Sequence, residues 1–275
     1  MRSLAWLLSL PIVAEAGEVL WSGFFNASAT AADFDKWSWS NQVGDWQWYI
    51  HGSASTETYL GLSPDNKNPA DSSDEQGIRI TIVGPISSSR ELEADNSQDG
   101  TSFWNGQTME RSEIIPQTKA DLGSGHLFYH FSLKTEDTNA PNPNFEHQIA
   151  FFESHFTELK YGTMSGASGK DNTLRWCVGG VSKWETDLEA GKWYNFAYEI
   201  DFDAKTVGLW ASNGADDLKQ VVSAVSASTS TNSADWHVGE LRLDNGGLNA
   251  AAEDWFWSGI FVEEAPITPG ISGPA

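Results

Sequence analysis

The alternation that decides the fold class is clearest in Gly77-Ile78-Arg79-Ile80-Thr81-Ile82-Val83, a run that ends at Gly84-Pro85. Every second residue in this run is an isoleucine. Because side chains on a strand point alternately to its two faces, this pattern is typical of a strand with one buried face. The glycine–proline pair that follows breaks the strand.

Similar short segments recur along the chain, separated by clusters of Gly, Asn, Asp, Ser and Pro. They cover residues 126–134, 147–153, 159–161, 174–178, 193–201, 206–211, 237–243 and 255–262. Only residues 30–37 indicate a turn or two of helix, with Thr30 as the cap. Many short strands without long helices predict an all-β protein, and we expect a concave β-jelly-roll sandwich of two antiparallel sheets.

The first residues are typical of a secretion signal. Arg2 supplies the positive charge, residues 4–13 form a short apolar run, and Ala14-Glu15-Ala16 fits the small-x-small cleavage pattern. We therefore expect a secreted, extracellular protein with a signal peptide over 1–16, one β-jelly-roll catalytic domain over 17–265 and a flexible Pro/Gly-rich tail over 266–275. No segment reaches the length of a membrane helix, so we expect no membrane partner, and we expect a monomer.

The composition excludes one class of partner. With 38 acidic against 16 basic residues and a net charge of −22, the chain is poorly suited to nucleic acid, whose binding requires neutralisation of phosphates. Cys177 is the only cysteine, so the chain forms no internal disulfide. If the substrate is anionic, its site must be a local basic island.

Three segments could form such an island. They are Glu110-Arg111-Ser112-Glu113-Ile114, the run from His147 to His155 that contains Gln148, and Glu158-Leu159-Lys160-Tyr161-Gly162. An Arg, a Gln and a Lys on adjacent strands could clamp a sugar carboxylate, because the planar guanidinium meets both oxygens. The alternative is that Arg111 and Glu113 form an ordinary ion pair and that Gln148 is a satisfied polar group.

These segments resemble two families of polysaccharide lyases. Arg111-Ser112-Glu113-Ile114 is similar to the R-S-E-L-R strand of jelly-roll alginate lyases, and Gln148-Ile149 to their Q-I-H strand, although Ile115 and Ala150 depart from that pattern. The run from His147 to Gly162, with the Trp-rich N-terminal part, is similar to the glucuronan lyases of polysaccharide lyase family 20.

The resemblance implies a secreted lyase that cleaves β-1,4-linked polyglucuronic acid, an anionic polysaccharide, by β-elimination. It implies that Gln148 and Arg111 neutralise the carboxylate and that Tyr198 removes the C5 proton. His51 would supply the imidazole that is missing at Ala150, with His155 as second choice. The substrate-binding residues that we expect are Lys160, Tyr194, His155, Trp48, Glu113 and Arg242.

Three alternatives remain open. The first is an alginate lyase. The second is a jelly-roll glycoside hydrolase of the laminarinase kind, because Glu199-Ile200-Asp201-Phe202-Asp203 comes near the E-x-D-x-E strand of that class, with Glu199, Asp201 and Asp203 as its carboxylates. The third is a non-catalytic lectin, which would use some of the fourteen tryptophans for sugar stacking.

The same resemblance to glucuronan lyases implies a structural calcium ion that ties the first and last strands together. Oxygen ligands are required, and Asp254, Asn26 and the backbone near Gly44 are the candidates. Asn26-Ala27-Ser28 is also an N-glycosylation sequon, so we expect a glycoprotein, and a glycan there would exclude Asn26 as a ligand.

Overall fold

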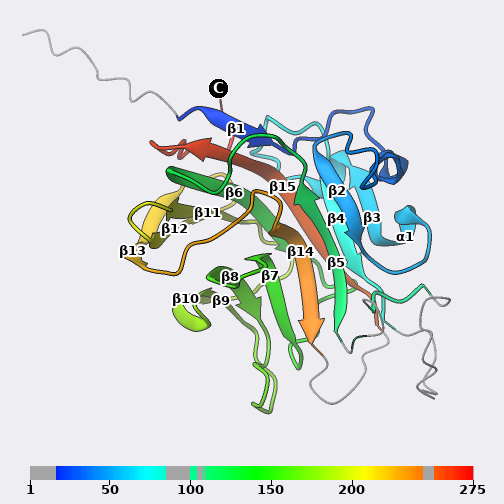
Figure 1. Ribbon diagram of the computed structural model, residues 1–275. Helices are drawn as coiled ribbons and strands as arrows, with labels where there is room; N and C mark the ends of the chain where they lie inside the picture. The colour runs from blue at the N-terminus through cyan, green and yellow to red at the C-terminus, as the bar shows by residue number, and fades with distance from the viewer. Residues whose placement is uncertain (1–16, 85–99, 104–106, 108, 244–250, 275) are drawn as a thin grey trace, which may run out of the picture.

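Two antiparallel β-sheets make up the protein in the computed structural model, which describes residues 17–84, 100–103, 107, 109–243 and 251–274. The first sheet has eight strands in the order β13-β12-β11-β6-β15-β4-β3, with β1 paired to β15 (Figure 1). The second has seven strands in the order β10-β9-β8-β7-β14-β5-β2. The predicted all-β jelly-roll sandwich is thereby confirmed.

The strands that the sequence predicted begin and end within two residues of the expected bounds. The eight-stranded sheet contains β1 (Val19–Ser22), β3 (Leu60–Ser63), β4 (Gly77–Ile82), β6 (His126–Thr135), β11 (Tyr194–Asp201), β12 (Thr206–Asn213), β13 (Lys219–Ser226) and β15 (Glu253–Glu264). The seven-stranded sheet contains β2 (Trp46–Ile50), β5 (Glu110–Pro116), β7 (Glu146–Phe152), β8 (Thr157–Tyr161), β9 (Thr173–Val178), β10 (Val181–Asp187) and β14 (Trp236–Leu243). Three short helices, η1 (Ala31–Lys36), α1 (Thr56–Tyr59) and η2 (Pro64–Asn66), complete the described elements.

The core lies between the two sheets and is rich in aromatic rings. Trp176 and Trp236 project into it from the seven-stranded sheet, and Trp255 and Trp257 from the eight-stranded sheet, all fully buried. Burial of such rings contributes roughly 1.5–3 kcal/mol each. The inward-facing side chains therefore hold the sandwich together, and the outer faces of both sheets are left for other uses.

The C-terminal residues, which were expected to form a flexible tail, contact the eight-stranded sheet. Ile267 and Ile271 pack against Phe128 and Leu218 on the outer face of the eight-stranded sheet. The backbone N–H of Leu218 also donates to the carbonyl of Pro269 at 2.8 Å. The two isoleucines gain apolar burial there, which explains why a Pro/Gly-rich segment lies along the sheet.

The predicted signal peptide, residues 1–16, lies outside the described residues. Among the described residues, no helix is long and apolar enough to cross a membrane.

Candidate active site

The candidate site lies on the outer face of the seven-stranded sheet. On β5, Ser112 and Ile114 face the interior, so Arg111 and Glu113 face outward, as their spacing predicts. On the neighbouring strand β14, Trp236 and Val238 face the core, which places His237 on the same outer face as Glu113. Glu153, directly after β7, completes a group of four that we call the carboxylate–histidine cluster: Arg111, Glu113, Glu153 and His237.

His237 bridges the two carboxylates of this cluster. Its Nδ1 lies 2.6 Å from Oε2 of Glu113, and its Nε2 lies 3.1 Å from Oε2 of Glu153. Arg111 contacts the same carboxylates: Nε and Nη2 donate to the two oxygens of Glu113 at 2.7 and 2.8 Å, and Nη2 lies 3.6 Å from Oε2 of Glu153. The imidazole and the guanidinium therefore both lie between two negative groups.

The separation of the two carboxylates follows from these contacts. Oε2 of Glu113 and Oε2 of Glu153 lie 2.8 and 3.6 Å from the same nitrogen, Nη2 of Arg111, so they cannot be farther apart than the sum of these distances, about 6.4 Å. Glycoside hydrolases place their paired carboxyl groups roughly 5–9.5 Å apart. The pair is thus close enough to act on one glycosidic bond.

The charges within the cluster shift two pKa values in opposite directions. Burial opposes the charged imidazole, but the charge of Glu113 and the hydrogen bonds with both carboxylates outweigh it and raise the pKa of His237 to about 9. The hydrogen bond from His237 outweighs partial burial and, with the charges of His237 and Arg111, lowers the pKa of Glu153 to about 2. At neutral pH the exchangeable proton of the site is therefore on His237, and Glu153 is ionised.

Glu153 is the one residue of this cluster whose side chain is exposed to solvent. The side chain of Glu153 is 60% exposed, whereas those of Glu113 and His237 are buried. Phe151 fixes the ring of His237 by stacking on it at 4.7 Å between centroids and 3° between planes, and His155 stacks on Phe151 at 5.0 Å. A substrate approaching this face meets Glu153 first.

The predicted site residues fall into two groups on this sheet. Arg111 and Glu113 belong to the cluster. Gln148, Lys160 and His155 share the outer face but contact other partners: Gln148 and Lys160 hydrogen-bond to Glu146 at 3.2 and 2.7 Å, and His155 to Glu158 at 2.9 Å. Leu241 of β14 pairs with Arg111 on one neighbouring strand and with Gln148 on the other. Gln148 and Arg111 are therefore two strand spacings, roughly 10 Å, apart.

Three predicted residues lie in the interior instead, and a fourth, His51, is half-buried beside them. Tyr198 is fully buried on β11 against Phe131, and burial raises the pKa of its hydroxyl well above the usual value, so it is not a base for a bound sugar. Tyr194, on the same strand, donates to the carbonyl of Asp187. Trp48 is a core residue, and His51 stacks on it at 4.2 Å.

Arg242 was predicted to bind substrate, and the structure places it in a buried ion network. Its guanidinium contacts Glu110 and, at 2.6 Å, Oε1 of Glu253 from the opposite sheet. Oε2 of Glu253 lies 2.6 Å from Nε2 of His147. Because buried charges are tolerated only with partners, this network is structural.

The carboxylates that the hydrolase alternative named lie on the eight-stranded sheet, away from the carboxylate–histidine cluster. Tyr198 and Ile200 face the core from β11, so Glu199 and Asp201 project from the outer face of the eight-stranded sheet. Glu199 accepts hydrogen bonds from Trp210 and Gln220 at 2.8 Å each, and Asp201 accepts one from the backbone of Ala204. Asp203 lies in the turn that follows.

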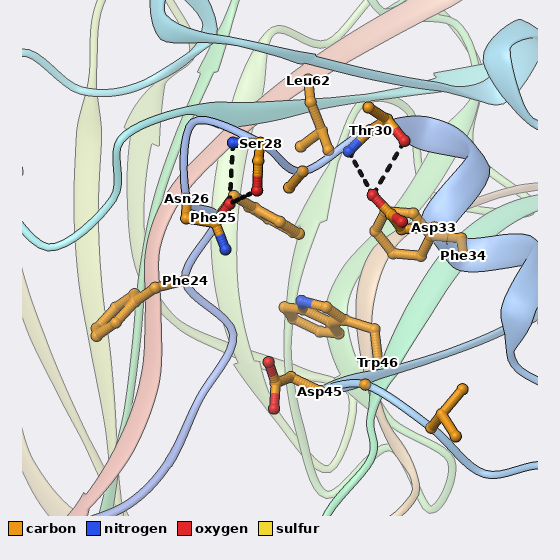
Figure 2. A pocket seen from close by; sticks show the side chains of 13 residues that line it. Phe24, Phe25, Asn26, Ser28, Thr30, Asp33, Phe34, Asp45, Trp46 and Leu62 are labelled. Carbon is orange, nitrogen blue, oxygen red and sulfur yellow. Dashed lines mark hydrogen bonds between the residues drawn. The ribbon is translucent and has the colours of Figure 1, made fainter.

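The predicted calcium ligands do not come together. Asn26 and Gly44 line a pocket of about 310 Å³, but Oδ1 of Asn26 already accepts from the backbone and hydroxyl of Ser28 (Figure 2). Asp254 pairs with Thr81, whereas Phe25, the neighbour of Asn26, pairs with Gln76. Thr81 and Gln76 are five residues apart along the chain, so Asp254 and Asn26 are separated by roughly 16 Å. The carboxylate of Asp254 accepts from Arg79, Thr81 and Asn139.

The three residues therefore do not fit one calcium ion. Among the described residues, no three His, Cys, Asp or Glu side chains are grouped to hold a metal. Calcium binding by this protein stays a prediction from the sequence.

Sequence reasoning missed Glu153 and His237. Strict alternation from Gln148 would turn Glu153 toward the core, but Ala150 adopts a left-handed backbone (φ 47°) beside a register irregularity with β14. Beyond it, Phe152 faces inward and Glu153 outward. His237 stands between the apolar residues Trp236 and Val238. This alternation in the sequence already indicated that the imidazole faces outward.

Comparison with known proteins identifies the class of this domain. Residues 19–268 match the family model described as glycoside hydrolase 131 catalytic N-terminal domain. A GH131 β-glucanase catalytic domain from Podospora anserina is 51% identical, with a TM-score of 0.85, covering 94% of this chain and 100% of its own. The catalytic domain of a glycoside hydrolase family 131 protein from Coprinopsis cinerea is 48% identical, with a TM-score of 0.80 and coverage of 93% and 98%. Among curated proteins the comparison gives no match.

These matches overturn the lyase assignment. The resemblance to glucuronan lyases rested on the run from His147 to Gly162 and on the Trp-rich N-terminal part, whereas the glycoside hydrolase family model matches residues 19–268. The expected β-elimination, the uronan substrate and the roles that depended on them, above all that of Tyr198, are wrong. The hydrolase alternative was right in reaction class, but its residues were not those of the cluster described above.

Proposed function

The chain belongs to the glycoside hydrolase 131 family, and from this premise we propose that it hydrolyses a β-glucan with Glu113 and Glu153 as its carboxyl pair. The observation that carries the proposal is the bridge that His237 forms between these two carboxylates on the outer face of the sheet. Hydrolysis of a glycosidic bond requires a carboxylate on one side of the bond and a proton donor on the other.

The pKa shifts divide these roles. Glu153 is exposed and ionised, so it acts on the anomeric side of the bond, as general base or as nucleophile. The departing oxygen needs a proton, and the pair of Glu113 and His237 holds one at neutral pH. Arg111 keeps both carboxylates in place and balances their charge. As general base, Glu153 takes a proton from the attacking water, and that proton can return to His237 across their 3.1 Å contact. As nucleophile, Glu153 is esterified to the sugar, and the neutral imidazole of His237 takes the proton of the water that releases it.

The charges around the cluster favour a neutral glucan over a polyuronate. An anionic chain would need unpaired cations, yet Lys160 is held by Glu146 and Glu158, and Arg175 by Asp171 and Glu185. Within the described part of this face, each of these cations already has a carboxylate partner. The basic island that an anionic substrate would require is thus neutralised by the protein itself.

The proposal includes export of the enzyme. A glucan polymer lies outside the cell, and the basic, apolar and small-x-small features of residues 1–16 match that destination.

The test is a panel of soluble polymers with two readouts. We expect new reducing ends from β-1,3-, β-1,4- or β-1,6-glucan, with no absorbance from unsaturated uronides on glucuronan or alginate. Ultraviolet-absorbing products from either uronan, or no reducing ends from any β-glucan, would refute the proposed function.

A further inference from the structure

An exposed indole stands out on the rim of the seven-stranded sheet. Among the described residues, Trp39 is the most exposed large apolar side chain, with 68% of its surface accessible. Exposure of so large an apolar ring is unfavourable in water, and such surfaces commonly mark binding sites.

The ring of Trp39 is held in place on other aromatic rings. Its centroid lies 5.0 Å from that of Trp37 and 5.3 Å from that of Tyr49, and Trp37 and Tyr49 stack on each other at 5.6 Å and 25°. Nε1 of Trp37 is anchored by a 2.9 Å hydrogen bond to Gln117. These three rings, Trp37, Trp39 and Tyr49, form what we call the aromatic platform.

The backbone beneath Trp39 is also fixed. Ser38 and Asn41 exchange two backbone hydrogen bonds, of 3.1 and 2.9 Å, which places Trp39 at the tip of a tight two-residue turn. The side chain of Asn41 donates to the carbonyl of Lys36 at 2.8 Å and ties this turn to η1. A rigid tip loses little conformational entropy when a ligand binds.

The platform adjoins the carboxylate–histidine cluster. Trp46 and Trp48 face the core from β2, so Tyr49 lies on the outer face, and β2 is the direct neighbour of β5, which carries Glu113. Burial, and then the charge of Glu113, raise the pKa of Tyr49, as expected for a hydroxyl near that carboxylate. With strands about 4.8 Å apart, the platform lies two to three strand spacings from His237 and Glu153.

From this geometry we propose that the aromatic platform is a carbohydrate-binding subsite, in which Trp39 stacks on a sugar ring of the same glucan chain whose bond is cleaved at the cluster. This proposal rests on the proposed function for the identity of the ligand. The apolar face of a pyranose ring matches an indole and carries no charge, so the chain's net charge of −22 does not oppose it. The distance to the cluster requires an oligosaccharide, because a single sugar ring cannot reach both.

The binding arm of the test uses a Glu153→Gln background, which slows cleavage. Calorimetry with glucan hexasaccharides and disaccharides compares this background with and without Trp39→Ala. We expect Trp39→Ala to weaken hexasaccharide binding about tenfold and to leave disaccharide binding at the cluster unchanged. Trp39→Phe should restore most of the affinity, and Val221→Ala, an exposed apolar residue on β13 of the other sheet, should change neither.

The kinetic experiment compares Trp39→Ala with wild type, and both proteins keep Glu153. We expect Trp39→Ala to raise KM for the polymer about tenfold with kcat within twofold. Equal hexasaccharide affinity with and without Trp39, or the same loss for short and long ligands, would overturn the subsite. Failure of the wild type to release reducing ends from any glucan would instead refute the proposed function, and Trp39-dependent binding of the hexasaccharide would still support the subsite.

Discussion

The Nδ1 atom of His237 lies 2.6 Å from Oε2 of Glu113, on the side of the imidazole away from the exposed carboxylate of Glu153. A buried carboxylate thus stabilises the charged imidazole, and the imidazole in turn stabilises an exposed carboxylate. The charge state of each group thus depends on that of its neighbour. A substitution or a pH change at one of them should therefore alter the others as well.

Removal of the exposed carboxylate should abolish most of the activity while the fold is kept. We expect Glu153→Gln to lower kcat about 100-fold or more, since an amide cannot act as base or nucleophile. The matched control is Glu199→Gln, a half-buried glutamate on the outer face of the other sheet, which should stay within twofold of wild type. A reducing-end assay with equal folded protein measures both. If Glu199→Gln were the inactive variant, the assignment of the active face would be wrong.

The activity should depend on pH through the same two groups. In kcat/KM, which reports the free enzyme, we expect an acidic limb near the pKa of Glu153, about 2, and an alkaline limb near that of His237, about 9. His237→Asn should lower the rate about 100-fold and remove the alkaline limb. An alkaline limb that persists in this variant would show that another group controls it.

Stability should fall at alkaline pH because of His237. Its pKa is raised from 6.5 in the unfolded chain to about 9 in the folded protein. The folded state therefore binds the proton more tightly, and this contribution, roughly 3 kcal/mol, is fully present below pH 6.5 and lost as the pH rises through 9. Urea unfolding of wild type and His237→Asn at pH 6, 8 and 10 measures it. The difference in unfolding free energy should shrink across this range, and a constant difference would contradict the shift.

A buried carboxyl group, that of Glu240, should destabilise the fold near neutral pH. Glu240 is fully buried, and neither of its oxygens has a hydrogen-bond partner among the described residues. Burial, and then the negative charges of Glu253 and Glu113, raise its pKa well above the usual value. The unfolded chain releases this proton at lower pH than the folded protein, so Glu240 destabilises the fold increasingly as the pH rises above about 4.5.

We therefore expect Glu240→Gln to be more stable than wild type at pH 7, with a gain that vanishes near pH 4. Melting temperatures at both values measure it. The exposed Glu57→Gln should show no such pH-dependent gain, and a gain at pH 4 equal to that at pH 7 would exclude titration as its cause.

The sequon at Asn26 should carry a glycan when the protein passes through a eukaryotic secretory pathway. Asn26 is exposed, and its Oδ1 accepts the Ser28 hydroxyl at 2.6 Å, which leaves Nδ2 directed away from Ser28 (Figure 2). Intact mass before and after treatment with an amide-cleaving glycosidase measures occupancy. Asn26→Gln should lose the added mass, and an unchanged mass in the wild type would refute modification.

The sequence was sufficient for the fold wherever one face of a strand is buried. β4, β6 and β11 were predicted because their apolar residues alternate. β10 and β13 were not, because they lie at sheet edges and expose most of their side chains, so no alternation marks them.

The site was predictable only in part. Arg111 and Glu113 follow regular alternation and were placed on the correct face. Glu153 could not be placed, because the backbone of Ala150 reverses the alternation just before it. The short motifs around these residues also misled the assignment of chemistry, since an Arg–Glu pair on a jelly-roll strand is compatible with more than one reaction.

The pairing of the first and last strands has a practical consequence. The N–H of Gly17 donates to the carbonyl of Pro266 at 2.9 Å, and β1 lies beside β15 in the eight-stranded sheet (Figure 1). A fusion partner or a surface tether joined near either of these residues would therefore emerge from the same edge of the molecule. Immobilised in this way, the enzyme would present the opposite sheet, with its carboxylates and indole, to an insoluble polymer.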